Sequence, residues 1–350
     1  MTMRDGIVEQ AGRFKKAIAS KDTSSYKVVK KNQLVVGFPI DEGVIYVQNH
    51  DAPGIMSPAY NVWNIDLGRV DPSYLEFALH GPRSMAYYAD KMRGTTARRR
   101  TLTADGLREM EILLPSADGQ IRVVNTLDEV RSLIEGASGQ IAMLDTLVKS
   151  RFVEMFGGMK YESVPMGHLV AEIVAGTNVG GKQRPLLKGE YGVLKISAVT
   201  KGVFDASQYK VVEDVSSIKM VHPRKGDLLF SRANTREMVG ATAIVDKDCA
   251  CLFLPDKLWR IDPTDEVNTV FLKALLSSSR MRREISNAST GSSGSMQNIS
   301  MTKFRSLPAF LPPLALQQEF AAFVAEVDKS RFNLLKAYGS IIALFRVLFP

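Results

Sequence analysis

The chain has 350 residues, of which 45% are hydrophobic and 23% are charged, with a formal net charge of +8. This composition is typical of an ordinary folded protein long enough for two domains, and it excludes a disordered chain. The positive charge favours a polyanionic partner such as nucleic acid. Two cysteines exclude both a disulfide framework and a four-cysteine zinc site. The sequence has neither a run of 18 apolar residues nor a signal peptide, so we expect a cytoplasmic protein that contacts no membrane.

Residues 1–116 predict a small globular unit. Asp71-Pro72 is a good helix start, and Gly81-Pro82 ends that helix and begins another. A basic loop, residues 93–100, follows, and a short strand that ends in Leu114-Pro115 leads out of the unit.

A long helix is predicted over residues 117–157. Its apolar residues recur at alternating steps of four and three, which is a heptad seam, and the central part runs roughly 50 Å. We expect this seam to form a helix pair and partner surface, with Leu127, Val130, Ile134, Ile141, Leu144 and Val148.

Residues 158–313 predict a second and fuller globular unit. Turn residues separate short apolar strands in 191–196, 227–230, 240–245 and 249–262. Residues 265–285 predict one or two helices, and a loop rich in Gly, Ser and Thr follows at 287–297. Each unit is therefore expected to be α+β, with a small mixed sheet and a helical side.

Residues 314–350 predict a second long helix. The seam continues there through Phe320, Val324, Val327, Leu334, Tyr338, Ile341 and Phe345. Two such seams in one chain can bury each other as an antiparallel coiled coil. Two separate helices, each packed on its own domain, remain the alternative.

The two halves of the chain repeat. Trp63 and Trp259 are the only tryptophans and are separated by 196 positions, whereas Leu75 and Leu272 are separated by 197, as are several later landmarks. A tandem duplication, a globular unit followed by a long helix, explains this spacing. The first copy lacks a counterpart of roughly 35 residues at its front. We expect it to be either naturally short or preceded by an upstream start codon.

Three motifs carry a resemblance to a known family. They are Lys225–Arg232 (KGDLLFSR), Gln297–Ser300 (QNIS) and Leu311–Gln318 (LPPLALQQ). In this order, followed by a long helix, they resemble the specificity subunit of type I restriction–modification systems. The resemblance implies an α+β protein with two tandem target-recognition domains, separated by two long antiparallel coiled-coil helices.

The resemblance also implies a function. The chain would be the DNA sequence-recognition subunit of a restriction–modification complex and would read a bipartite, asymmetric site in double-stranded DNA. It would dock two methyltransferase (M) subunits and the restriction (R) subunits. Two alternatives stay open: a fragment of a fused restriction–methylation enzyme, and a coiled-coil scaffold without a role in DNA binding.

The sequence predicts no catalytic residue, metal site or cofactor. The chain has no Walker or dinucleotide loop, and its only Pro-Pro, Pro312-Pro313, does not belong to the motif that holds a flipped base. The histidines have no ligand spacing. We therefore expect a non-catalytic subunit.

The candidate DNA contacts lie in loops that carry basic and amide side chains. In the first unit, like charges without acidic partners favour phosphate at Arg93, Arg98, Arg99 and Arg100. In the second unit, arginine can pair with guanine and asparagine with adenine, which favours base readout by Arg232, Asn234 and Arg236. Further phosphate contacts are expected from Lys182, Arg184, Gly291, Ser292, Ser293 and Gln297. An ordinary solvated loop is the alternative at each place, and core packing is favoured for both tryptophans.

Overall fold

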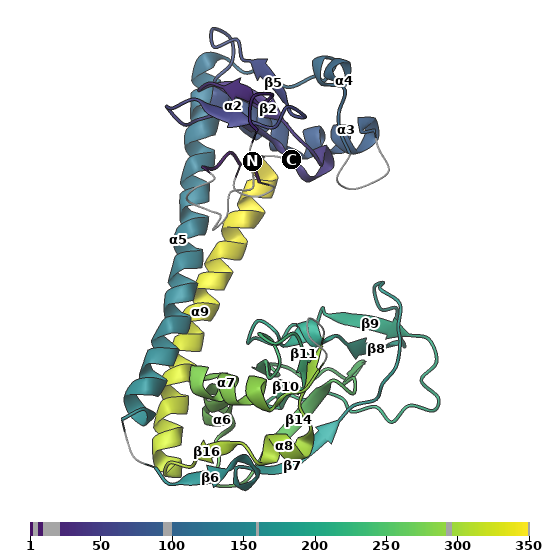
Figure 1. Ribbon diagram of the computed structural model, residues 1–350, viewed down its shortest axis with the longest axis vertical. Coiled ribbons are helices and arrows are strands. Elements are labelled where there is room, and N and C mark those ends of the chain that lie inside the picture. The colour runs from purple at the N-terminus through teal and green to yellow at the C-terminus, as the bar shows by residue number, and fades with distance from the viewer. Residues whose placement is uncertain (3–5, 10–21, 94–99, 159–160, 292–295, 349–350) are drawn as a thin grey trace. The chain divides into compact units, whose positions relative to one another are not determined.

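The computed structural model describes residues 1–2, 6–9, 22–93, 100–158, 161–291 and 296–348, with side chains up to residue 340 in the last helix. The chain divides into two compact units. Unit 1 comprises Met1–Ser138 and Leu335–Pro350, and unit 2 comprises Gly139–Leu334. Both combine small sheets with helices, so the fold class is α+β, as predicted (Figure 1). No helix in the described ranges is long and apolar enough to cross a membrane.

The strands of unit 1 form two small antiparallel sheets. They are β1 (Lys27–Val29), β2 (Gln33–Val36), β3 (Ile45–Val47), β4 (Gly54–Met56) and β5 (Asn61–Asn64). One sheet pairs β1 with β4, and the other has the order β3-β2-β5. A 3₁₀ turn, η1 (Ile40–Glu42), connects β2 to β3.

The helices of unit 1 are α2 (Pro72–His80), α3 (Pro82–Lys91) and α4 (Ala104–Arg108). The Asp71 side chain accepts a hydrogen bond from the Tyr74 backbone N–H, and a proline occupies the first turn of both α2 and α3. The helix starts predicted at Asp71-Pro72 and Gly81-Pro82 are thus confirmed. Tyr88 on α3 and Leu34 on β2 belong to the buried core between the helices and the sheet.

Unit 2 contains the fuller set of strands. They are β6 (Ser163–Pro165), β7 (Val170–Ala175), β8 (Tyr191–Leu194), β9 (Tyr209–Val212), β10 (Leu228–Ser231), β11 (Ala233–Asn234), β12 (Thr242–Ile244), β13 (Leu252–Phe253), β14 (Leu258–Pro263), β15 (Gln297–Asn298) and β16 (Pro308–Phe310). The principal sheet has the order β12-β10-β14-β7, and a second sheet has the order β13-β8-β9. Two short pairs, β16 with β6 and β11 with β15, complete the unit.

The core of unit 2 lies between the principal sheet and helices α6 (Thr269–Ser277), α7 (Ser279–Ala288) and α8 (Met301–Arg305). Trp259 is 2% exposed, and its ring stacks on Phe230 at 5.6 Å between centroids. Phe304 of α8 meets both rings edge-on. The prediction that Trp259 packs in a core is confirmed.

The duplication is visible element by element. The bounds of α6, α7 and α8 are those of α2, α3 and α4 shifted by 197 positions. A buried glutamine recurs at the same offset. Gln120 accepts from the Asp71 N–H and donates to the carbonyls of Arg69 and Pro115.

Gln317 makes the same three bonds, accepting from the Asn268 N–H and donating to the carbonyls of Glu266 and Pro312. These two networks join each globular part to the start of its long helix in the same way. The prediction of a tandem duplication is therefore confirmed.

The long helices are α5 (Ala117–Phe156) and α9 (Leu314–Leu348). Each predicted seam residue up to Tyr338 is buried or half-buried, whereas the side chains of Ile341 and Phe345 lie outside the described ones. In unit 2 the helices run antiparallel, because Arg151 pairs with Glu319 at 3.0 Å and Asp145 pairs with Arg331 twelve positions further along α9. The expected helix pair is present in this unit.

Candidate nucleic-acid interface

Two of the predicted DNA-binding segments of unit 2 meet. Strand β11 pairs with β15 so that Asn234 lies opposite Gln297, and the Ile299 N–H donates to the Arg232 carbonyl at 3.0 Å. A bridge between Thr290 and Asn298 closes the loop 291–297 at its base. The sequence interpretation treated these segments separately, because Thr235 and Gln297 are 62 positions apart.

The loop needs glycine at its first position. A Cβ on Gly291 would lie 2.4 Å from the Met296 carbonyl oxygen, which no side chain tolerates. Ser292 and Ser293, two of the predicted phosphate contacts, lie outside the described residues. Gly291 is therefore explained by the close approach of the two sides of the loop.

The predicted base-reading residues have different surroundings. The Arg232 Nε donates to the Asp256 carbonyl at 2.9 Å, and its Nη2 lies 3.4 Å from the Asp256 carboxylate. These bonds hold Arg232 against the loop before β14. Asn234 is half-buried and its side-chain oxygen accepts from the Thr235 N–H at 2.9 Å. Arg236 is exposed on the turn that follows.

The sequence interpretation missed one basic side chain, that of Arg282, which contacts the turn after β11. The Arg282 Nη2 donates to the Glu237 carbonyl at 2.7 Å, and burial lowers the pKa of its guanidinium. Arg282 belongs to α7, where three arginines among other polar residues resemble an ordinary solvated helix face. Only the packing of α7 against the turn after β11 distinguishes it.

The equivalent loop of unit 1 has the same base. Arg93 and Thr101 exchange both backbone hydrogen bonds, at 2.9 and 3.0 Å, as Thr290 and Asn298 do in unit 2. The Arg93 side chain is exposed. Arg98 and Arg99 lie outside the described residues.

Arg100 corrects one premise of the sequence interpretation. We expected the arginine cluster to lack acidic partners, yet the Arg100 guanidinium pairs with Asp41 at 2.6 Å and with Glu42 at 3.3 Å. Its side chain is 24% exposed. The acidic pair comes from η1, nearly 60 positions earlier, so no local pattern could reveal it. Arg100 is held within its own unit.

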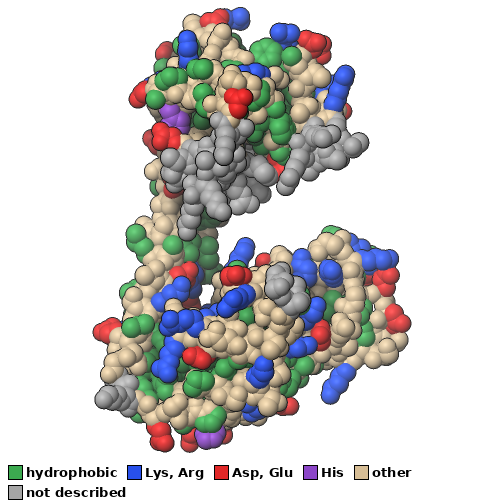
Figure 2. Space-filling model, viewed as in Figure 1, with side chains coloured by type: hydrophobic (Ala, Val, Ile, Leu, Met, Phe, Trp, Pro, Cys, Tyr) green, Lys and Arg blue, Asp and Glu red, His purple; other side chains and the backbone are tan. Residues whose placement is uncertain are grey.

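Lys182 and Arg184 are also paired locally. The Lys182 Nζ lies 2.7 Å from Glu213, and the Arg184 guanidinium binds both oxygens of Glu190 at 2.6 and 2.7 Å. The Arg184 pair lowers the pKa of Glu190 to about 2. Acidic side chains stand among the basic ones over the visible face of unit 2 (Figure 2).

The seam residues of the long helices are largely covered. The surface that the helices of unit 2 expose to solvent is therefore formed by residues outside the seam. Apolar side chains that are about half exposed or more there are Met143, Leu147, Val153 and Phe332. They lie off the heptad positions, which is why the seam did not reveal them. Phe332 also lines a groove of about 810 Å³ with Lys225, Ala325, Asp328, Lys329 and Asn333.

In the described part of the chain, no group of three or more His, Cys, Asp or Glu side chains is arranged to hold a metal ion. Cys249 is buried, Cys251 is exposed, and both are free thiols.

Comparison with known proteins identifies the architecture. Residues 170–339 match the family described as "Type I restriction modification DNA specificity domain". This part of the chain is similar to such a specificity domain. The resemblance to specificity subunits of type I restriction–modification systems, drawn from its motifs, is confirmed.

A curated relative supports the same family. The EcoEI specificity subunit of Escherichia coli, a type I restriction enzyme subunit, is 25% identical over 175 residues. The match covers 48% of this chain and 29% of the relative, so the chain spans less than a third of that protein's length.

Two solved structures have a fold similar to that of this chain. The type I restriction–modification S subunit from M. genitalium has a TM-score of 0.54 at 15% identity, over 99% of this chain and 92% of that one. A chain from a study of complex assembly and conformational transition of the type I R-M system also has a TM-score of 0.54, at 18% identity, over 92% and 80%. The predicted architecture of two α+β domains and coiled-coil helices is thus confirmed.

Proposed function

We propose that the chain is the DNA sequence-recognition subunit of a type I restriction–modification complex. It reads a bipartite, asymmetric site in double-stranded DNA and docks methyltransferase and restriction subunits. One observation carries the proposal. The two units present loops on equivalent bases, closed by Arg93–Thr101 and Thr290–Asn298, but the loop residues differ. Equivalent placement with different side chains is what two different half-sites require.

Within unit 2, we assign base reading to the residues that are not already held by an acid. Asn234 and Gln297 lie side by side, and an amide can bind adenine through two hydrogen bonds. Exposed Arg236 has the chemistry for guanine or phosphate. Arg232 positions β11 through Asp256. Replacing Asn234 or Gln297 by alanine should cost about 1–3 kcal/mol per lost base contact, only in the half-site read by unit 2.

Within unit 1, we assign phosphate contacts to Arg93, Arg98 and Arg99. A triple alanine variant should weaken binding equally across sequences and flatten the salt dependence by up to about 0.9 per lost contact. Arg100 is already paired, so its removal should act on folding first. An unchanged salt slope in the triple variant would contradict this assignment.

Partner docking is assigned to the helices. In unit 2, exposed Phe332 and Met143 offer apolar surface of the kind that protein partners bury. The purified chain should neither methylate nor cut DNA, and methylation should require a methyltransferase subunit. Phe332→Asp should abolish that activation, and Lys329→Ala, in the same groove, should weaken it much less.

A loop exchange tests the proposal as a whole. The chain is combined with a methyltransferase subunit, and methylated sites are mapped across a random DNA library. Exchanging residues 94–100 with 291–297 should change the bases of both half-sites. The exposed variant Arg83→Ala, on α3, serves as the control and should leave the target unchanged. An unchanged target after the exchange would remove the loops from recognition.

The spacing between the half-sites has a separate test. A helical turn of DNA spans about 34 Å, so two units joined by long helices should address half-sites about one turn apart. Inserting seven residues in α5 between Leu127 and Val148 preserves the heptad and adds about 10 Å. The tolerated gap should change while both half-sites stay the same. Altered half-site bases with an unaltered gap would contradict the proposal that the long helices set the spacing.

A further inference from the structure

The DNA phosphates of the half-site read by unit 2 lack an assigned partner. Lys182 and Arg184, two cations that the sequence suggested, are paired with glutamates. The loop of residues 291–297 contains no charged residue, whereas the equivalent loop of unit 1, residues 94–100, ends in three arginines. DNA binding is driven largely by the neutralisation of phosphates. If unit 2 binds DNA, the cations that do this therefore lie outside its loop.

The charge missing from this loop is found on the helix before it and on the turn after β11. Helix α7 and residues 235–239 carry a net charge of +2, whereas the equivalent α3 and residues 38–42 carry −1. The loops that follow these helices carry 0 in unit 2 and +3 in unit 1. Each copy thus has a net charge of +2 over the same three segments, placed differently. This is what two copies need if both bind the same polyanion.

One face of α7 is a stripe of hydrogen-bond donors. Its members follow one another at steps of three and four residues, are all exposed, and are Arg280, Arg283, Asn287 and Thr290. The opposite face buries Met281 and Ile285 in the core of unit 2. The stripe therefore faces solvent. It ends at the base of the recognition loop, where Thr290 bridges to Asn298.

The two arginines of the stripe are not neutralised. Among the described residues, no carboxylate lies within 4.0 Å of the guanidinium of Arg280 or Arg283. Glu284, the acid of the same helix, is half-buried and pairs with neither. Other arginines of unit 2, such as Arg232 and Arg260, are paired with aspartates. An exposed guanidinium without a carboxylate is free to bind a phosphate through two hydrogen bonds.

The equivalent face of unit 1 differs at its centre. At an offset of 197, Arg283 and Asn287 correspond to Ala86 and Asp90 of α3. Asp90 is exposed, and its carboxylate lies 3.4 Å from Lys91. A carboxylate in the middle of the face repels phosphate. The centre of the helix face therefore suits a polyanion in unit 2, whereas in unit 1 the loop does so.

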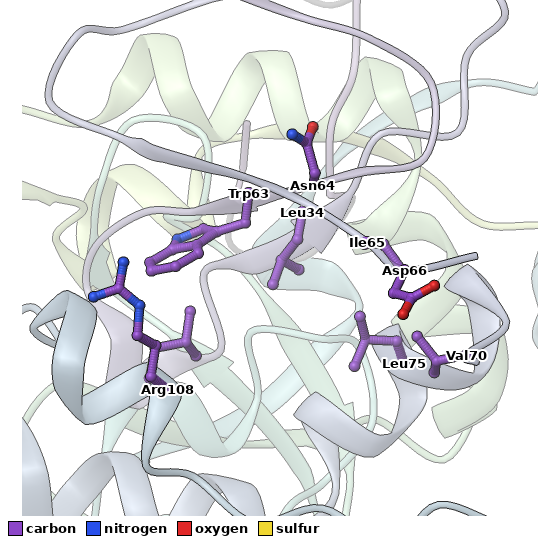
Figure 3. Close-up of a pocket in the computed structure, with 9 residues that line it drawn as sticks. Leu34, Trp63, Asn64, Ile65, Asp66, Val70, Leu75 and Arg108 are labelled. Carbon is purple, nitrogen blue, oxygen red and sulfur yellow. The ribbon is translucent and has the colours of Figure 1, made fainter. Parts of the chain in front are cut away.

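Arg108 of unit 1 shows the contrasting case of a guanidinium that is directed towards its own unit. It pairs with Asp105 at 3.0 Å and lies 5.1 Å from the centre of the Trp63 ring. Both Arg108 and Trp63 line a hollow of about 230 Å³ (Figure 3). Within the described ranges, Arg280 and Arg283 have no such contacts, so their guanidinium groups stay available to a partner.

Helix α7 is fixed to the turn that follows β11. The Arg282 Nη2 donates to the Glu237 carbonyl at 2.7 Å, and the Ser286 hydroxyl donates to the Arg236 carbonyl at 3.5 Å. The packing is close, because a Cβ on Gly240 would lie 2.8 Å from the Arg282 Nη1. The stripe therefore belongs to the same surface as the turn and the β11–β15 pair, to which base reading is assigned.

We propose that the exposed stripe of α7 is the phosphate-binding site of unit 2. Arg280 and Arg283 bind DNA phosphates that flank the bases read by Asn234 and Gln297, and Arg282 positions the turn beside them. The helix thus does in unit 2 what the arginines of the loop do in unit 1. This inference rests on the proposed function, because it names the groups through which the same DNA is held.

The first test is the salt dependence of binding. The full chain is combined with a methyltransferase subunit, and its affinity for DNA is measured between about 50 and 200 mM salt. Arg280→Gln/Arg283→Gln should flatten the slope of log K against log salt by up to about 1.8, so that affinity falls about tenfold less over this range. The methylated bases should stay the same, because phosphates carry no sequence information. An unchanged slope would overturn the proposal.

A charge-matched variant provides the control. Lys182→Gln/Arg184→Gln removes the same charge from unit 2, but at residues paired with glutamates, so the slope should stay the same. Equal flattening in both double variants would show a general effect of net charge and rule the stripe out. A wild-type complex that binds no DNA would contradict the proposed function and the stripe with it. Specific binding by the wild type, with an unchanged slope in the stripe variant, would remove the stripe alone.

Removing charge from the DNA tests the site with the wild-type protein. A methylphosphonate replaces one phosphate at a time along the half-site whose bases change in Asn234→Ala. The wild-type complex should lose affinity about threefold or more at one or two positions, and Arg280→Gln/Arg283→Gln should lose none there. Substitutions in the other half-site should affect both proteins alike. A wild-type complex indifferent to every phosphate of the first half-site would disprove the assignment, even if the variant failed to fold.

Discussion

Replacing Gln317 by alanine should destabilise unit 2 far more than the loss of one polar side chain usually does. The side chain is fully buried and serves three backbone groups: the Asn268 N–H at 2.8 Å and the carbonyls of Glu266 at 3.0 Å and Pro312 at 2.8 Å. Each bond contributes about 1 kcal/mol, and each stranded buried group costs about 1–3 kcal/mol. We therefore expect a loss of about 3–6 kcal/mol, a large fraction of the stability of an ordinary domain.

The neighbouring residue provides the control. Gln318 is exposed on the same turn of α9, so Gln318→Ala should change the free energy of unfolding by about 0.5 kcal/mol or less. Because the two units can unfold separately, the assay is hydrogen exchange resolved by segment. Gln317→Ala should speed exchange in residues 268–277, and Gln120→Ala should do so in residues 71–80. Equal stability of Gln317→Ala and Gln318→Ala would refute the reasoning.

Three shorter predictions follow from single contacts. Arg184→Ala should return the pKa of Glu190 from about 2 towards 4.5, as measured by carboxyl NMR titration. Because that pKa is depressed in the folded chain, the stabilisation is complete above pH 4.5 and should fade as the pH falls towards 2. Arg100→Ala should cost unit 1 about 1–3 kcal/mol in segment-resolved exchange, since it strands a poorly exposed carboxylate of η1. Gly240→Ala should cost about 1–3 kcal/mol in the unfolding of unit 2, because its φ is +80° and α7 lies 2.8 Å from the added Cβ. Gly180→Ala, with open space around its Cβ, should cost much less.

The contacts of the candidate interface were only partly predictable. Residues 232–236 and Gln297 were singled out because amide and basic side chains in loops suit DNA, and the pairing of β11 with β15 does bring them together. The acidic partners of Arg100 and Arg232 were not predictable, because Asp41 and Asp256 are brought to them by the folding of distant segments. Whether a basic residue is available to DNA depends on such pairs.

The sequence by itself determined the repeat and the long helices. An offset of 197 positions and a heptad seam are one-dimensional patterns, and helix caps such as Asp71-Pro72 act within a few residues. Local rules therefore placed the starts of α2 and α3. They also made the twofold plan of the chain evident before any contact was known.

Which of two equivalent side chains in the repeated units is buried was decided only by the tertiary structure. Trp63 and Trp259 occupy equivalent strands in similar local sequence, yet only Trp259 is covered by β7 and its turn. Likewise, Arg108 and Arg305 have the same place on equivalent helices, and within the described ranges only Arg305 is seen to bind a strand. Burial and pairing depend on segments far away in the chain, so the local sequence around each tryptophan or arginine could not distinguish the two environments.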